Sequence, residues 1–143
     1  MSSGLGYGRK DLQGLAEAKL FDAVILANAG RHSNAYYLAG YAIELALKAC
    51  ISRQFLAETI PDPALARRVY DHDFGKLVGL AGLSHSLNAA KLADPAFGAH
   101  WSTVAEWTEG SRYETADRYS CELMLEAVRN EPSGVLTWLK KHW

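Results

Sequence analysis

Strand signals are almost absent from this chain of 143 residues. No run of β-branched residues alternates with polar ones, and no Asn-Gly or Asp-Gly pair marks a hairpin. Apolar residues instead recur at steps of three and four, as they do in helices that pack on one face. The sequence therefore predicts an all-α fold, an up-and-down bundle of about five helices with a short C-terminal helix. We expect a single domain over residues 1–143, with residues 1–8 as a flexible N-terminus.

The chain is also poor in cysteine, net charge and long apolar runs. Cys50 and Cys121 are too few for a disulfide framework, and the five histidines show no metal-ligand spacing, so we expect no metal and no cofactor. A net charge of −1 excludes nucleic-acid binding through bulk charge, though not through a local basic patch. Glu44 and Lys48 interrupt the most apolar stretch, residues 35–51. We expect no membrane contact and, without a signal peptide, a cytoplasmic protein.

Helix start and stop signals divide the chain into segments. The periodicity predicts helices over residues 11–29, 33–58, 73–83, 87–107 and from about 113 to Pro132, with a last short helix after Ser133. We expect Asp94-Pro95 either to split the fourth of these or to reset its start. Residues 59–64 are typical of a linker, and residues 108–111 of a turn.

The second predicted helix carries a recognisable string. Residues 34–49, NAYYLAGYAIELALKA, resemble the helix that marks the small prokaryotic HEPN-domain proteins. Residues 16–24, residues 72–83, and Trp107 with residues 111–113 resemble further parts of that family. The resemblance implies a helical bundle that pairs into a homodimer with a central groove for nucleotide or RNA. It also implies, for some members, a nucleotidyltransferase partner.

Some HEPN proteins are metal-independent ribonucleases, and the resemblance allows their motif to be tested here. They use an Arg, four to six residues and then a His, near the start of the last core helix. Arg112 stands at the Arg position, but residues 117–119, where the His would fall, are Asp, Arg and Tyr. The Asp would repel the phosphate, and the Arg and the Tyr are poor bases at neutral pH because their pKa values lie far above 7. Arg67 and His72 have the spacing but precede the third predicted helix, so we assign no catalytic residue.

Four residues of the second predicted helix share one face. Tyr37, Tyr41, Glu44 and Lys48 recur at steps of four, three and four. Glu44 and Lys48 stand in the favourable order for an i, i+4 ion pair. A Glu in so apolar a helix needs a donor or a wet groove. This face either lines a ligand groove or forms an interface whose polar groups satisfy one another.

A second candidate group lies near the predicted start of the last long helix. Arg112 and Arg118 can hold phosphate there, and Tyr113 can stack on a base. Alternatively, Glu114 and Asp117 neutralise both arginines and leave a solvated face.

Taken with the resemblance, these two groups predict a non-catalytic binding module for a nucleotide, RNA or a nucleotidyltransferase partner. We expect it to act as a homodimer through the second or the last long helix. Two alternatives stay open. One is a metal-independent ribonuclease of a toxin–antitoxin system, and the other is a purely structural partner subunit.

Overall fold

The computed structural model describes residues 6–143, and this part of the chain is helical without a strand. The all-α prediction is therefore confirmed. In chain order the elements are α1 (Arg9–Asn28), α2 (His32–Ser52), α3 (Pro63–Arg68), α4 (Phe74–Leu80), α5 (Ser84–Ala93), α6 (Pro95–Ala105), the 3-10 helix η1 (Glu109–Tyr113), α7 (Arg118–Arg129) and α8 (Val135–Leu139).

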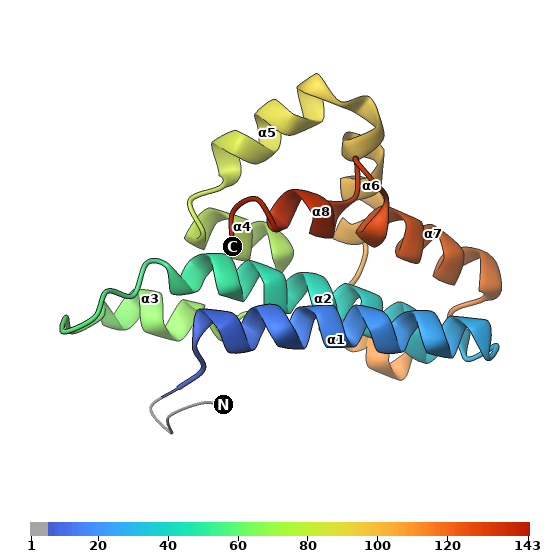
Figure 1. Cartoon of the computed structure of the whole chain (residues 1–143), viewed down its shortest axis with the longest axis horizontal. Coiled ribbons are helices and arrows are strands. Elements are labelled where there is room, and N and C mark those ends of the chain that lie inside the picture. Colours follow the sequence, from blue (N-terminus) through green and yellow to red (C-terminus); the bar gives the residue numbers. More distant parts are fainter. Residues whose placement is uncertain (1–5) are drawn as a thin grey trace.

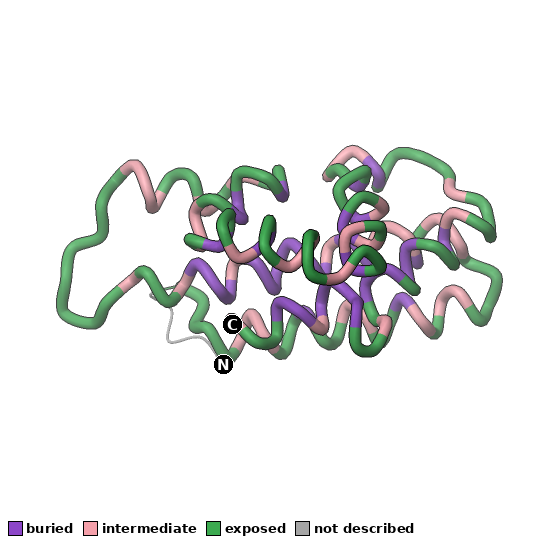
Figure 2. The backbone as a smooth tube through the Cα atoms, turned by 90° about the horizontal axis from the view of Figure 1, so that it is seen from above, coloured by how far each residue is buried: buried purple, intermediate pink, exposed green. Residues whose placement is uncertain are grey.

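Helix α2 forms the centre of the fold. It runs beside α1 for most of its length and also packs against α4, η1, α7 and α8 (Figure 1). More than half of its residues are buried, and many are alanines that let neighbouring helices approach closely. Figure 2 shows this burial along the inner elements, whereas the outer turns are exposed.

A second layer covers α2 on the side away from α3. Helices α6, α7 and α8 pack on one another there, and α5 rises from α4 to join α6 as an arch (Figure 1). Its core side chains are fully buried and apolar, among them Met124, Leu136 and Leu139, together with Ile43 and Leu47 from α2. The short α8 completes this core, as its periodicity predicts.

Two predicted boundaries are wrong in the first half of the chain. Helix α2 ends at Ser52 rather than at residue 58, because the next amides form turns and Glu58 takes a left-handed φ of 62°. Part of the predicted linker begins α3, since the Asp62 carboxylate accepts a hydrogen bond from the Ala64 amide and Pro63 suits a first helical position. Residues 1–5 of the predicted flexible N-terminus lie outside the described residues, and Gly8 leads directly into α1.

In the second half, the split expected as one of two alternatives at Asp94-Pro95 is confirmed, and one boundary differs. The predicted helix over residues 87–107 is split into α5 and α6, because Asp94 caps α6 by accepting hydrogen bonds from the Ala96 and Phe97 amides. The predicted turn continues as η1 to Tyr113, and α7 begins only at Arg118. Tyr113 and the arginine before it therefore lie on η1 rather than at the start of a long helix.

Candidate functional site

The predicted polar face of α2 exists, and its members contact one another. Lys48 Nζ lies 3.2 Å from Glu44 Oε2, and the Glu44 side chain is only 3% exposed. One turn earlier, the rings of Tyr37 and Tyr41 stack with centroids 5.9 Å apart. The contacts agree with an i, i+4 ion pair on a face of α2 that other elements cover.

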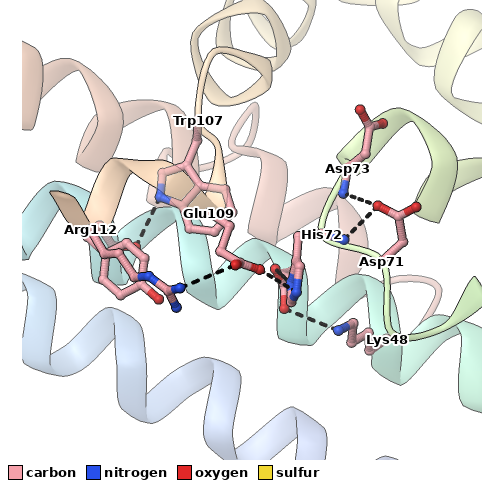
Figure 3. A network of polar contacts seen from close by, with 9 residues as sticks. Lys48, Asp71, His72, Asp73, Trp107, Glu109 and Arg112 are labelled. Carbon is pink, nitrogen blue, oxygen red and sulfur yellow. Dashed lines mark hydrogen bonds and ion pairs between the residues drawn. The ribbon is translucent and has the colours of Figure 1, made fainter. Parts of the chain in front are cut away.

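His72, in the loop before α4, extends this face into a chain of charged groups. Its Nδ1 lies 2.9 Å from Glu44 Oε1, and its Nε2 contacts Glu109 Oε2. Glu109 Oε1 in turn lies 3.5 Å from Arg112 Nη2. Figure 3 shows these contacts converging from α2, the loop and η1. We call Lys48, Glu44, His72, Glu109 and Arg112 the His72 network.

Two aspartates hold the loop that carries His72. The Asp71 carboxylate accepts hydrogen bonds from the amides of His72 and Asp73, at 2.7 and 2.9 Å. The Asp73 amide above all, then the His72 amide and the Lys76 charge, keep the pKa of Asp71 below its ordinary value. Asp73 caps α4, and its carboxylate accepts a hydrogen bond from the Lys76 amide at 2.9 Å. His72 is thus fixed between a tight turn and a helix start.

A column of aromatic rings holds η1 against α2. Trp107 stacks on Phe74 of α4 and on Tyr37 of α2, with ring centroids 5.1 and 5.7 Å apart. Its indole Nε1 donates to the Tyr37 carbonyl oxygen at 3.1 Å (Figure 3). The ring lies over Gly40, where an added Cβ would stand 2.1 Å from Trp107 Cδ1. Only glycine permits this approach, which places Glu109 beside His72.

Basic and acidic side chains alternate along the His72 network, and His72 lies between two carboxylates. A neutral imidazole can donate from only one nitrogen, so His72 donates to both carboxylates only when it is protonated. Glu44 is buried and needs such donors, because an unpaired buried carboxylate is costly. Arg112 lies at the other end of the network. Its pKa is raised above the ordinary value, first by a hydrogen bond with Tyr113 and then by the charges of Tyr113 and Glu109 and a hydrogen bond with Tyr37.

A pocket of about 290 Å³ opens beside the network. Tyr41, Glu44 and Lys48 form one wall. The other walls are mainly apolar and aromatic, and include Tyr7, Leu12, Leu45, Phe55, Val69 and Tyr70. Partial burial first, and then the Glu44 charge, raise the pKa of Tyr41, so its hydroxyl stays protonated at neutral pH. The structure thus brings three of the four predicted α2 residues to one pocket.

The arginines of the predicted phosphate patch each pair with a carboxylate. Arg118 Nε lies 2.8 Å from Glu122 Oε1, and Arg112 pairs with Glu109 as described above. The sequence points to Glu114 and Asp117 for this role, and neither makes these ion pairs.

Asp117 instead caps α7, where its carboxylate accepts a hydrogen bond from the Ser120 amide at 2.7 Å. This bond is the main reason that the pKa of Asp117 is lowered. Tyr113 is exposed, and its ring lies 4.9 Å from the Arg112 guanidinium carbon. The two predicted arginines therefore serve separate contacts rather than one patch.

Sequence reasoning missed the roles of His72 and Glu109. The signal was Glu44, whose place in an apolar helix demands a donor, but the sequence does not say which residue supplies it. Arg67 has the motif spacing to His72 but is exposed, while both nitrogens of His72 contact carboxylates. The His72–Arg112 relationship, bridged by Glu109, arises only in three dimensions.

No group of three or more His, Cys, Asp or Glu side chains between residues 6 and 143 is arranged to hold a metal ion. Over the same range, no helix has the length and apolarity that crossing a membrane requires. No family model, curated protein or solved structure compared with this chain matches it.

Proposed function

We propose that the protein is a HEPN-like binding module that takes a nucleotide or a short RNA in the pocket beside the His72 network. One observation carries the proposal. Tyr41, Glu44 and Lys48, three of the binding candidates predicted from the sequence, line the pocket together with further aromatic side chains. Its volume of about 290 Å³ is of the order of small ligand sites.

The chemistry of the walls suits a base that carries a phosphate. Tyrosine rings stack on any base, because every base has a π-face. Lys48 uses one of its three donors on Glu44, so it can also donate to a phosphate or to a base edge. Because Glu44 is paired on both oxygens, the pocket does not present an uncompensated negative charge to the ligand.

Binding of nucleotides tests this proposal directly. We expect calorimetry to detect mononucleotides or short RNA at low salt, and Tyr41→Leu to weaken binding by about 1–3 kcal/mol with little change in salt dependence. Lys48→Met should lower the log-salt slope by roughly 0.7 for a single strand. Tyr119→Leu and Lys91→Met, which lie outside the pocket, are the matched controls. No binding by the wild type would favour the purely structural subunit instead.

We also propose that two copies pair through the outer face of α1. Helix α2, one of the two helices favoured by sequence, is enclosed within the chain and is not available. On α1 the exposed residues Gly14, Ala18, Phe21 and Ile25 follow a four-three-four spacing. Antiparallel pairing about a two-fold axis would place each copy's large residues over the other's small ones.

Light scattering across a dilution series tests the dimer. Phe21 is 68% exposed, so Phe21→Asp should yield a folded monomer. Leu92→Asp on α5 is the matched control, because Leu92 is also exposed and lies outside this face. A wild-type monomer at high micromolar concentration would overturn the pairing.

One observation favours RNA cleavage as a second candidate function. Glu109 bridges His72 and Arg112, which supplies a proton-transfer group, a carboxylate and a phosphate-binding cation within one network. Incubation with a mixed RNA pool and EDTA tests it. Cleavage that His72→Gln and Arg112→Gln both abolish, while Arg67→Gln does not, would support this function. Absence of cleavage by the wild type supports the non-catalytic module.

A further inference from the structure

A second pocket lies where the turn between α1 and α2 meets α7. Its volume is about 460 Å³, and the residues that line it are Ala27, Asn28, Gly30, His32, Arg118, Glu122, Leu125 and Arg129. We propose that this pocket binds a phosphate oxyanion. The site goes beyond the proposed function and shares no residue with the pocket beside the His72 network.

Two arginines of α7 line the pocket. Arg118 and Arg129 lie eleven residues apart, which is roughly 16 Å along a helix. Arg118 is paired with Glu122 at 2.8 Å. Between residues 6 and 143 no carboxylate lies within ion-pair distance of Arg129, so its guanidinium keeps its donors for a ligand. Arginine presents these donors in a fork that matches phosphate oxygens.

His32 supplies an independent indication. Its Nδ1 is buried, yet it makes no hydrogen bond within the described part of the chain. Buried polar atoms are nearly always paired, and His32 also lines the pocket, so a turn of its ring would bring this unpaired nitrogen to a ligand there. A nitrogen that carries a proton at this position can donate to a phosphate oxygen.

The start of α2 contributes a favourable field. The N-cap residue Arg31 gives no side-chain hydrogen bond to the first turn of this 21-residue helix. The first amides of α2 and the positive end of the helix dipole therefore stay available to an anion beside His32. Two carboxylates oppose this positive field. Glu122 forms an ion pair with Arg118. Asp117 lies near His32, but its carboxylate already caps α7 by accepting a hydrogen bond from the Ser120 amide.

The balance of charge around the pocket favours one oxyanion. Arg118 and Arg129 carry two positive charges, and Glu122 carries the only negative charge among the lining residues. Leu125 and Ala27 add apolar surface between the two arginines, which suits the sugar or base beyond a phosphate. We therefore expect free phosphate to bind and a nucleotide monophosphate to bind more tightly.

The two pockets lie well apart, so an experiment can show loss of binding in one pocket while binding in the other is unchanged. His32 and Lys48 are sixteen residues apart on α2, roughly 24 Å along the helix axis. A variant of Arg129 should therefore leave Tyr41-dependent base binding unchanged. Conversely, Tyr41→Leu should leave phosphate binding at α7 unchanged.

Titration of the full chain with inorganic phosphate, at constant ionic strength and observed by NMR, tests the site. We expect saturable shifts of the His32 imidazole and of the Arg129 side chain. Arg129→Gln should weaken binding about tenfold, the scale of one lost hydrogen bond to a charged group. His32→Leu should weaken it as well, and Arg68→Gln on α3 is the matched loss of one charge.

Each outcome decides for or against the site. Tighter binding of a nucleotide monophosphate than of phosphate would identify a nucleotide as the source of the oxyanion, whereas equal binding would identify free phosphate. Shifts that do not saturate, or equal loss in Arg129→Gln and Arg68→Gln, would overturn the proposal and leave Arg129 as a cation that only complements the end of α7.

Discussion

Glu44 and His72, 28 positions apart in the chain, are joined by a 2.9 Å contact between Oε1 and Nδ1. The contact ties the loop before α4 to the centre of α2. It also leaves the second imidazole nitrogen facing Glu109 on η1. One histidine thus links three elements that are distant in sequence, around a carboxylate that the core has buried.

We predict that Glu44 and His72 are energetically coupled. Glu44→Gln should lower the free energy of unfolding, because it weakens the contacts of both His72 and Lys48 with a buried carboxylate. Since the His72 side chain is 47% exposed, we expect a coupling of about 1 kcal/mol in a double-mutant cycle with His72→Asn, near the low end of the usual range.

Urea denaturation of the four proteins measures this coupling. Glu122→Gln is the control, because Glu122 forms an exposed ion pair with Arg118, and such pairs contribute little to stability. Strictly additive effects of Glu44→Gln and His72→Asn would show that the contact does not stabilise the fold.

We predict that Gly40→Ala destabilises the protein although alanine is the better helix former. The added Cβ would stand 2.1 Å from Trp107 Cδ1, and the ring has no free space because it stacks on both sides. Overpacking of this kind costs about 1–3 kcal/mol, which exceeds the gain of about 1 kcal/mol from helix propensity.

Gly79→Ala in α4 is the matched control for this prediction. An added Cβ there meets only Ser84 Oγ at 3.9 Å, so the propensity gain should raise the thermal midpoint. Thermal unfolding of both variants checks the pair. A rise in the midpoint of Gly40→Ala would mean that Trp107 does not depend on this close approach.

Much of the fold follows from sequence, since α1, α2 and α4 each have an apolar period, although that period does not mark the end of α2 at Ser52. Pro95 after Asp94 also marks a boundary, but whether a helix restarts or continues depends on packing that the sequence does not show. The late start of α7 is decided by Asp117, which captures the Ser120 amide. Several such cap candidates compete along the chain, and propensity alone does not choose among them.

The candidate site is only half predictable for a related reason. Tyr37, Tyr41, Glu44 and Lys48 lie on one helix, so the helical period alone brings them together. His72 and Glu109 come from a loop and a 3-10 helix, whose placement depends on Trp107 meeting Gly40. No local pattern encodes that meeting.

The last prediction concerns Cys50, a buried thiol at the end of α2. Burial raises its pKa from 9.0 to about 11, although the charge of Arg53 acts in the opposite direction. Below pH 9 the thiol is protonated in both the folded and the unfolded chain, so it contributes no pH dependence. Between pH 9 and 11 the unfolded chain loses the proton first, so the free energy of unfolding falls as the pH rises.

Comparison with Cys50→Ala isolates this effect, because the two proteins share every other ionisable group. Cys50→Ala should be less stable at pH 8, since it removes buried volume, but it should lose less stability than the wild type between pH 9 and 11. Urea denaturation at pH 8, 9, 10 and 11 measures the two slopes. Parallel curves would mean that the folded chain admits water or a cation to the thiolate. In that case Cys50 would also react readily with a thiol reagent at pH 8.5, whereas the raised pKa predicts slow reaction.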